Sequence, residues 1–360
     1  MGKSSGPRVG SLSKTSTTFR VLLTIVPALI VVLLLVSIPQ TAAHSPLTSG
    51  ENESLATAAI VPDPAKSWAI YAELHEGSEA QYFRFNMTQG ERIYAMLLKS
   101  TRPENEEFMP IMILMGSGLS GQGDAPDYVE VPEGAGVLIG ESEQPAQATY
   151  EPFSPSSFYP LAKIDLDAPA TGTYYVAVHD PAQGGYYGLA VGYIESYSLN
   201  EWLLIPISLI SVYQWDGQSI ALIFAPLAAT LTVGLGLIWW KKFRKTSWTV
   251  FDIIVVLAGL LFMSSGVSIL FQMALALAKT SIAPEIALTL IFAVIPIILG
   301  IATLRLALKR PGAVTFRLRI YLVMLAFAAL FAWAGLLIGP ALALLAGVFP
   351  RRTSTRLERK

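Results

Sequence analysis

The sequence contains no cysteine and only three histidines, and charged residues make up 14% of its 360 residues. A chain without cysteine forms no disulfides, so any part of it outside the cytoplasm must be stabilised by its own core or by its neighbours. The Walker and HExxH patterns of nucleotide and zinc-peptidase sites are also missing. We therefore predict no catalytic residue and expect that the protein is not an enzyme.

Hydrophobic residues, by contrast, make up 53% of the chain and gather in long runs. A helix needs about 20 apolar residues to cross the roughly 30 Å of a membrane's hydrocarbon core. Five runs approach or exceed this length: 21–38, 218–240, 250–278, 284–304 and 320–349. The sequence thus predicts a multi-pass protein of the cell membrane with about five α-helical spans.

Acidic and basic residues are distributed unequally along the chain. Residues 44–200 contain 21 Asp and Glu but only 6 Lys and Arg, whereas the rest contains 19 basic and 5 acidic residues. Short cytoplasmic loops of membrane proteins carry an excess of Lys and Arg. Such residues flank the apolar runs here: Lys14, Arg20, Lys241, Lys242, Arg244, Lys245, Lys309, Arg310, Arg317 and Arg319. We therefore expect the large acidic region to be extracytoplasmic.

The C-terminal segment conflicts with this scheme. Five spans that begin inside place the C-terminus outside, yet 351–360 contains five basic residues. A break at Gly339 and Pro340 would divide the last run into a span and a short re-entrant piece, because proline disrupts helices and glycine loosens them. The nine residues after Pro340 are too few to span again. We predict five spans with the tail outside.

The first run has features of both a signal peptide and an anchor. The small residues 41–43 follow it, but its 18 apolar residues exceed the usual 7–15 of a signal-peptide core, which favours a retained anchor. The predicted organisation is a cytoplasmic N-terminus (1–20), an anchor or signal (21–39), a linker (40–66), an extracytoplasmic domain (67–198), an interfacial segment (199–216), a four-helix transmembrane bundle (217–350) and a basic tail (351–360).

The extracytoplasmic domain has the pattern of an all-β fold. Apolar and polar residues alternate in 80–86, turn residues follow in 88–91, and an apolar run resumes in 92–98. Further short strands are predicted in 108–115, 136–140 and 162–167. The segment HDPAQGG (179–185) lies between two alternating stretches, which predicts that His179 ends a strand and enters a hairpin. Many short strands with Gly and Pro between them favour a β-sandwich.

Three stretches carry a family resemblance: YFRFNMTQGERIYAMLL (82–98), FMPIMILMG (108–116) and GTYYVAVHDPAQGGYYGLAVG (172–192). Their order resembles the bacterial pre-peptidase C-terminal (PPC) domain, a small jelly-roll-like β-sandwich. The resemblance covers about a third of the chain, and this sequence departs from the pattern by a long insert at 116–159. It implies an accessory or binding module. The apolar runs resemble no transporter, channel or enzyme family.

Two metal hypotheses arise from the extracytoplasmic region. The insert contains four carboxylates, which suit Ca²⁺, although their spacing is not that of an EF-hand loop; a solvated acidic loop is the alternative. These residues are Asp124, Asp127, Glu130 and Glu133. If the chain were cut after Ala43, the amine and imidazole of His44 could bind copper with His75 or His179. The alternative is three ordinary histidines.

Other polar residues suggest further sites. Asn52 and Asn86 begin N-glycosylation sequons. Within the apolar runs, Gln272 and Glu285 are the polar groups on which transport could depend, although helix packing and capping at a helix N-terminus are the alternatives.

Composition and patterning together favour a membrane-anchored extracytoplasmic binding or assembly protein. We expect its partners to be the lipid bilayer and another envelope or membrane protein or a glycan, and we expect no nucleic acid. One alternative is a transporter or channel subunit with a regulatory outer domain, and a second is a copper-binding protein that uses His44. No cofactor is predicted apart from the calcium alternative.

Overall fold

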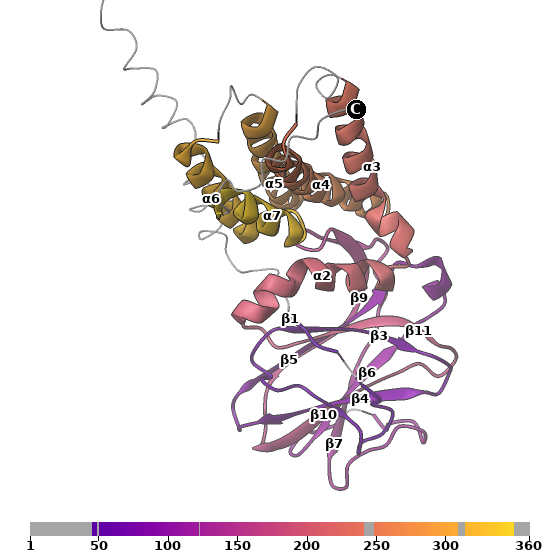
Figure 1. Cartoon of the computed structure of the whole chain (residues 1–360). Helices are drawn as coiled ribbons and strands as arrows, with labels where there is room; N and C mark the ends of the chain where they lie inside the picture. The colour runs from indigo at the N-terminus through magenta and orange to yellow at the C-terminus, as the bar shows by residue number, and fades with distance from the viewer. Residues whose placement is uncertain (1–44, 49, 122, 241–247, 309–313, 349–360) are drawn as a thin grey trace, which may run out of the picture.

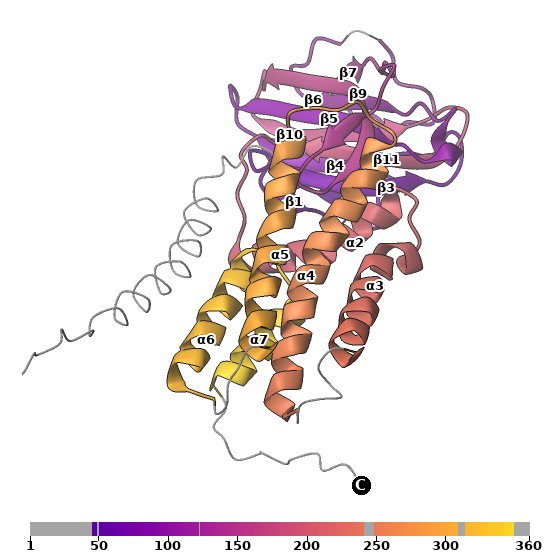
Figure 2. The same ribbon diagram turned by 90° about the horizontal axis from the view of Figure 1, so that it is seen from above.

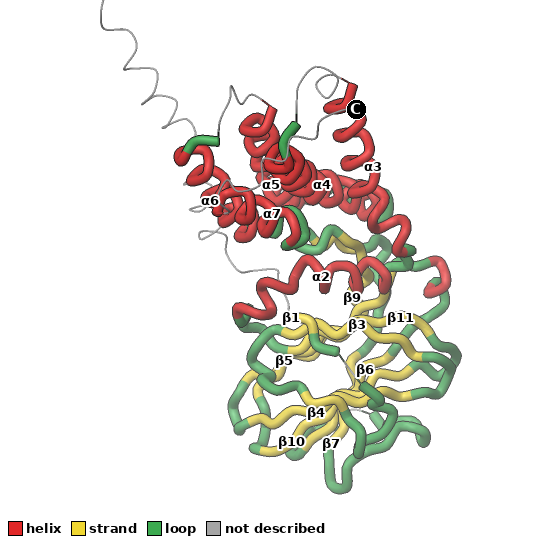
Figure 3. The backbone as a smooth tube through the Cα atoms, in the orientation of Figure 1, coloured by secondary structure: helices red, strands yellow, loops and turns green. Residues whose placement is uncertain are grey.

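A computed structural model of the chain describes residues 45–348 except 49, 122, 241–247 and 309–313. Strands form the N-terminal part and helices the C-terminal part, and the two lie against each other (Figure 1). Figure 3 shows this separation by colour, with helix α2 (Leu199–Trp215) next to the strands. The expected β region followed by helices is thus confirmed.

The β region is a sandwich of two sheets. One sheet has six strands in the order β1 (Ser45–Pro46), β3 (Trp68–Leu74), β11 (Gly185–Val191), β5 (Arg92–Ser100), β9 (Ser156–Asp167) and β8 (Thr149–Glu151). The other has five, in the order β2 (Ala59–Ile60), β4 (Ala80–Met87), β10 (Gly172–His179), β6 (Ile111–Gly116) and β7 (Gly136–Gly140). The edge strand β1 pairs with β3 in parallel, and the edge strand β2 pairs with β4 in parallel; the other described strand pairs are antiparallel. A short 3₁₀ helix, η1 (Pro103–Asn105), follows β5.

Alternation along the strands builds the core. On β4, Phe83, Phe85 and Met87 point between the sheets, where Leu97 of β5 and Val176 of β10 meet them. Because successive side chains of a strand point to opposite faces, Tyr82 lies on the outer face of the five-stranded sheet. The predicted strands are therefore real elements, and the alternation indicates which side chains point between the sheets.

Residues 45–66, which we predicted as a linker, instead belong to the sandwich where the structure describes them. Strands β1 and β2 come from this segment, and Ala58 and Val61 are buried. With residues near Val129 of the insert, Ala58 covers the outer face of the five-stranded sheet. The linker prediction is wrong here because Ser, Thr, Ala and Pro also form short edge strands and covering loops.

The segment HDPAQGG does not form the predicted hairpin. Strand β10 belongs to the five-stranded sheet and β11 to the six-stranded sheet, so 180–184 crosses from one sheet to the other. Asp180 holds this corner: its carboxylate accepts hydrogen bonds from the backbone N–H of Ala182, Gln183 and Met109 at 2.8, 3.1 and 2.8 Å. Residues 88–91 likewise join β4 and β5 of different sheets. Alternation predicts strands but does not say with which strand each one pairs.

Six helices follow the sandwich: α2, α3 (Ile220–Ile238), α4 (Val250–Leu277), α5 (Ile286–Leu308), α6 (Phe316–Phe331) and α7 (Ile338–Val348). Seen from above, α4 and α5 run side by side and reach the sandwich, whereas α3 stands to one side (Figure 2). Among the described helices, α3, α4 and α5 are long and apolar enough to cross a membrane. The structure therefore supports three spans, not clearly the five predicted; the first run lies outside the described residues.

The last apolar run, 320–349, is not one span. The chain reverses after α6, and α7 runs back beside it (Figure 2). A Cβ atom at Gly347, near the end of α7, would lie 3.2 Å from the carbonyl oxygen of Arg319, near the start of α6. The start of α6 and the end of α7 therefore lie side by side, and both face away from the sandwich (Figure 2). The break was expected at Gly339 and Pro340, but it lies at 332–337.

Helices α4 and α5 approach closely through glycine. A Cβ atom at Gly266 would lie 2.3 Å from the carbonyl oxygen of Ala293, and one at Gly300 would lie 2.6 Å from that of Gly259. Small residues let helix backbones approach in apolar surroundings, where packing rather than water exclusion holds helices together. The helical core accordingly contains many alanines, among them Ala258, Ala326, Ala329 and Ala343.

Candidate functional site

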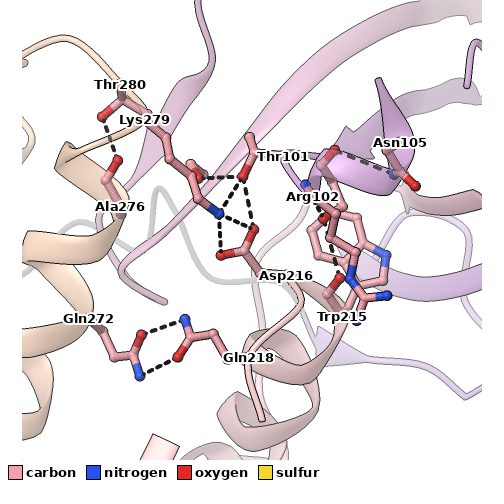
Figure 4. Close-up of polar contacts among 12 residues, drawn as sticks. Thr101, Arg102, Asn105, Trp215, Asp216, Gln218, Gln272, Ala276, Lys279 and Thr280 are labelled. Carbon is pink, nitrogen blue, oxygen red and sulfur yellow. Dashed lines mark hydrogen bonds and ion pairs between the residues drawn. The ribbon is translucent and has the colours of Figure 1, made fainter. Parts of the chain in front are cut away.

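Polar contacts join the sandwich to the helices. Lys279, just after α4, donates to Thr101 Oγ1 at 3.0 Å and to Asp216 Oδ1 at 3.2 Å, and Thr101 donates to Asp216 at 2.9 Å (Figure 4). Burial raises the pKa of Asp216, and the nearby Lys279 ammonium offsets this only in part. A buried carboxylate needs such partners, since an unpaired charge is costly to bury.

Further contacts join the sandwich to α5 and to α2. Tyr150 of β8 bonds to Thr289 of α5 through their hydroxyl oxygens, 2.7 Å apart, and Thr289 donates to the carbonyl of Pro152 at 2.7 Å. At the start of α2, Lys66 and Glu201 form an ion pair at 2.7 Å. The two parts of the molecule are thus joined at several points, which fixes how α2 lies between them.

Two cavities lie along α2, and both are lined by Phe153, Ile205 and Leu209. We name them the helix-side cavity and the sandwich-side cavity. Phe153 stacks edge-on against Phe292 of α5 and Trp333 of the hairpin, with ring centroids 5.9 and 5.6 Å apart. A side chain of the sandwich therefore enters the helical part and contributes to both cavities.

The helix-side cavity has a volume of about 120 Å³, similar to the ~150 Å³ apolar cavity that takes up benzene in a well-studied case. Its walls come from α2, α3, α4, α5 and the turn of the α6–α7 hairpin. Most of its lining is apolar, and the polar part comes from one stripe of α4: Ser264, Ser265, Ser268 and Gln272. A mainly apolar cavity with a few polar groups is the usual form of a small-molecule site.

The turn that borders this cavity has a strained backbone. Trp333, Leu336 and Leu337 have φ angles of 49°, 51° and 64°. Large residues rarely adopt this left-handed conformation, and each instance costs about 1–3 kcal/mol. The turn is held by two hydrogen bonds: Gly335 N–H donates to Ser265 Oγ at 2.8 Å, and Trp333 Nε1–H donates to the Trp202 carbonyl at 2.9 Å. Strain of this kind is concentrated at functional sites.

Gln272, one of the predicted membrane-polar residues, lies at this cavity. Its side chain is 2% exposed and forms a reciprocal amide pair with Gln218, at 2.7 and 2.9 Å (Figure 4). The pair uses both a donor and an acceptor of each amide, so Gln272 serves packing between α4 and the chain before α3. Glu285, the other predicted residue, is exposed just before α5 and does not line the cavity.

The sandwich-side cavity, of about 130 Å³, lies between α2 and the outer face of the six-stranded sheet. Its lining includes Tyr71, Leu98 and Trp215, and Glu151 is the one formally charged residue among the described residues that line it. Glu151 ends the edge strand β8, and its Oε1 accepts a hydrogen bond from Phe153 N–H at 3.0 Å. Strand β8 thus directs a carboxyl group into largely apolar surroundings.

The pKa of Glu151 is raised to about 7, mainly by burial; the neighbouring Glu195 carboxyl adds to the rise, and the backbone hydrogen bonds from Phe153 and Ser154 offset it in part. The same surroundings raise the pKa of Tyr71 and Tyr197 above their usual value, mainly through burial. A carboxyl with a strongly shifted pKa in a cavity marks a candidate functional site. The arrangement can hold either a proton or a positively charged group.

The copper hypothesis needs His44 together with His75 or His179 and stays a prediction. His44 lies outside the described residues. His179 is buried, and its Nδ1 lies 2.9 Å from the Tyr128 hydroxyl; burial lowers its pKa. His75 is exposed and groups with Glu53 and Glu79, with one ligand atom from each within 4.8 Å of the others. His179 is not a member of this group.

Glu79 already has several donors in that group. Its carboxylate accepts from the backbone N–H of His75 and Glu76 and from Gln81 Nε2. These bonds fix the turn between β3 and β4. The four carboxylates predicted for calcium form no group of this kind among the described residues; Glu130 instead accepts from Leu55 N–H at 2.8 Å. Calcium at the insert stays a prediction.

The two sequons differ in accessibility. Asn52 is 3% exposed, and its Nδ2 donates to the Tyr82 carbonyl at 3.3 Å. A glycan on this nitrogen is incompatible with that packing. Asn86 is exposed near the end of β4, where its Oδ1 accepts from Thr173 at 2.8 Å. Asn86 is the sequon that the fold leaves accessible.

Sequence reasoning did not identify Glu151, Phe153 or Trp333. The stretch TYEPFSPSS (149–157) was placed within an insert rich in Gly, Pro and acids, and Trp333 lay in an unbroken apolar run. One signal was present: a phenylalanine between Pro152 and Pro155 is unusual in a solvated loop, because large apolar side chains there gain from burial. No protein-family model and no curated protein matches this chain.

Proposed function

We propose that this chain is a membrane-anchored extracytoplasmic binding protein that holds an amphiphilic molecule, such as a membrane lipid, at the junction of its sandwich and its helices. The helix-side cavity is the observation that carries this proposal, because it combines an apolar wall, a polar stripe and a strained turn. Helices α3, α4 and α5 are long and apolar enough to cross a membrane, and in this proposal the bilayer beside them supplies the bound molecule.

In this proposal the sandwich is a PPC-like accessory module that faces outward. Its outer surfaces remain available to an envelope or membrane protein or to a glycan. The alternative of a transporter or channel subunit has less support, because Gln272 is paired with Gln218 and Glu285 lies away from the cavity. A copper-binding role depends on His44, which lies outside the described residues.

The α6–α7 hairpin suggests a topology that removes the conflict at the basic tail. With an anchor at 21–38, spans α3, α4 and α5, and a hairpin that returns to its starting side, both termini face the cytoplasm. Because the chain has no cysteine, single cysteines report on sidedness without background. In intact cells, a membrane-impermeant maleimide should label S281C and spare T355C; labelling of T355C would contradict this topology.

Photo-crosslinking tests the binding proposal. The full-length protein in membranes is exposed to a lipid with a diazirine on its acyl chain, and labelled peptides are mapped by mass spectrometry. We expect labels on α2, on the polar stripe of α4 and on the hairpin turn. Ser268→Phe should fill the cavity and remove most of this labelling, because Ser268 lines it.

Ala274→Phe is the matched control, since Ala274 lies exposed on the same helix. It should leave the labelling of the cavity unchanged, and both variants should keep the helical circular dichroism of the native protein. If Ser268→Phe and Ala274→Phe are labelled alike, or if labels fall only on the outer faces of the helices, the proposal is wrong.

A further inference from the structure

The sandwich-side cavity adds a preference for charge to the proposed site. Glu151 is the charged residue among those described in its lining, and four aromatic side chains surround the same space: Tyr71, Phe153, Phe158 and Trp215. Aromatic rings attract cations through their negative faces, and a carboxylate within a desolvated site strengthens that attraction. This chemistry suits an organic ammonium group and disfavours an anionic one.

The two cavities are close enough to serve one molecule. Phe153, Ile205 and Leu209 line both of them, so the two spaces lie on either side of the same three side chains. The helix-side cavity is mainly apolar with a neutral polar stripe, whereas the sandwich-side cavity holds a carboxyl. An amphiphile with a hydrocarbon chain and a cationic head matches this division.

We propose that the sandwich-side cavity binds the amine or quaternary ammonium head of an amphiphile, with Glu151 as its counter-ion, while the hydrocarbon chain occupies the helix-side cavity. This inference rests on the proposed function and specifies its ligand class. It places a single negative charge where the head enters, between the six-stranded sheet and α2.

The ionisable groups around Glu151 determine how binding responds to pH. Tyr71 of β3, Tyr150 of β8, and Glu195 and Tyr197 of the segment before α2 interact with it electrostatically. Helix α2 contributes Ile205, Ser208 and Leu209 to the lining, none of which ionises. Since the pKa of Glu151 is about 7, affinity for a cation should fall as the pH drops below 7, because the carboxyl then takes up a proton.

The test uses three probes that share a ten-carbon chain. Decyltrimethylammonium, decanol and decanoate are titrated into the full-length protein in a neutral maltoside detergent, and binding is followed by calorimetry at pH 8 and pH 5.5. At pH 8 we expect the cation to bind most tightly and the anion least. The advantage of the cation over decanol should shrink at pH 5.5.

Variants of the protein distinguish binding of the cationic head from binding of the hydrocarbon chain. Glu151→Gln should weaken binding of the cation about tenfold, as loss of a desolvated cation partner predicts, and should leave decanol unaffected. Glu195→Gln is the matched control, because Glu195 does not line the cavity; its effect should be smaller. Ser268→Phe should weaken binding of decanol and of the cation alike.

The outcomes distinguish the two proposals. If decanol binds and Ser268→Phe prevents it, but the cation has no advantage or Glu195→Gln matches Glu151→Gln, the assignment of the head is wrong and the binding function stands. If no ten-carbon probe binds, or if Ser268→Phe changes nothing, both fail. Unchanged circular dichroism and thermal melting of Glu151→Gln show that the variant is folded.

Discussion

The sandwich and the helical part are stabilised in different ways. The core of the sandwich consists of large side chains such as Phe83, Leu97 and Tyr174, each buried between two sheets. The helices instead pack through alanine and glycine, with backbone oxygens close to Gly266 and Gly300. Water drives the burial of large apolar groups in the first case, whereas close contact must hold helices together where the surroundings are themselves apolar.

The candidate site lies where these two kinds of packing meet. Helix α2 and Phe153 lie between the sandwich and the helices, and both cavities are lined by them. The junction also contains two carboxyls: Asp216 is paired with Lys279, whereas Glu151 lines the sandwich-side cavity, where its charge can serve binding.

The largest expected effect concerns the charge at the junction. A carboxyl with an ordinary pKa near 4.5 and a folded pKa of about 7 binds a proton more tightly in the folded protein. The contribution of Glu151 to the free energy of unfolding should therefore be fully present below pH 4.5 and be lost as the pH rises through 7, a loss of up to about 3 kcal/mol. Glu151→Gln should remove this dependence and be the more stable protein at pH 8.

Hydrogen exchange resolved by peptide measures this effect in β8 and β9 between pH 5 and 8, after correction for the intrinsic exchange rate. Peptides from β4 and β10, which are remote from Glu151 in the other sheet, serve as the internal control. If the native protein and Glu151→Gln show the same pH dependence in β8, the carboxyl does not titrate as its surroundings indicate.

A smaller effect should distinguish close helix packing from exposed helix surface. Gly266→Ala places a methyl group 2.3 Å from the carbonyl oxygen of Ala293, so α4 and α5 must separate; overpacking of this kind costs about 1–3 kcal/mol. Gly236→Ala on α3 meets nothing within 4 Å, and alanine in place of glycine stabilises a helix by roughly 0.5–1 kcal/mol. The midpoint temperature at which the helical circular dichroism signal is lost should fall for Gly266→Ala and not for Gly236→Ala. Equal shifts would contradict the packing described.

The sequence predicted the strands more accurately than their arrangement. Phe83, Phe85 and Met87 alternate, and that alternation fixed both the strand and its buried face. It could not show that β10 pairs with β4 and β6 while β11 pairs with β3 and β5, because pairing depends on side chains distant in sequence. Hydropathy likewise identified 320–349 as apolar but not that the chain reverses at Trp333, since a buried turn and a span have the same composition.

The candidate site was harder to predict than the fold. Glu151 owes its pKa to burial under α2 and to Glu195, which is 44 positions away. Ser268 is one polar residue of an apolar run, and only its position beside Trp333 and Phe153 makes it part of a cavity. Such a site contains no local motif, because its residues come from several elements and each has an ordinary local role. Gln272 was singled out, but its pairing with Gln218 required the structure.

The smallest expected effect tests the joint between the two regions. Lys279 is about a third exposed while Asp216 is nearly buried, with side-chain exposures of 36% and 5%, so solvent screens their attraction in part. A double-mutant cycle of Lys279→Met and Asp216→Asn should give a coupling energy of about 1 kcal/mol. Lys279→Met alone should destabilise more than the double variant, because it leaves the Asp216 carboxylate without its cation. The shifts of the thermal unfolding midpoint at pH 7 measure the coupling energy and the destabilisation by Lys279→Met. The pair of Arg92 and Asp165, with side-chain exposures of 44% and 30%, mutated in the same way, should show weaker coupling, because water screens it more. Coupling as weak at Lys279 as at Arg92 would mean that this ion pair does not help to hold the sandwich to the helices.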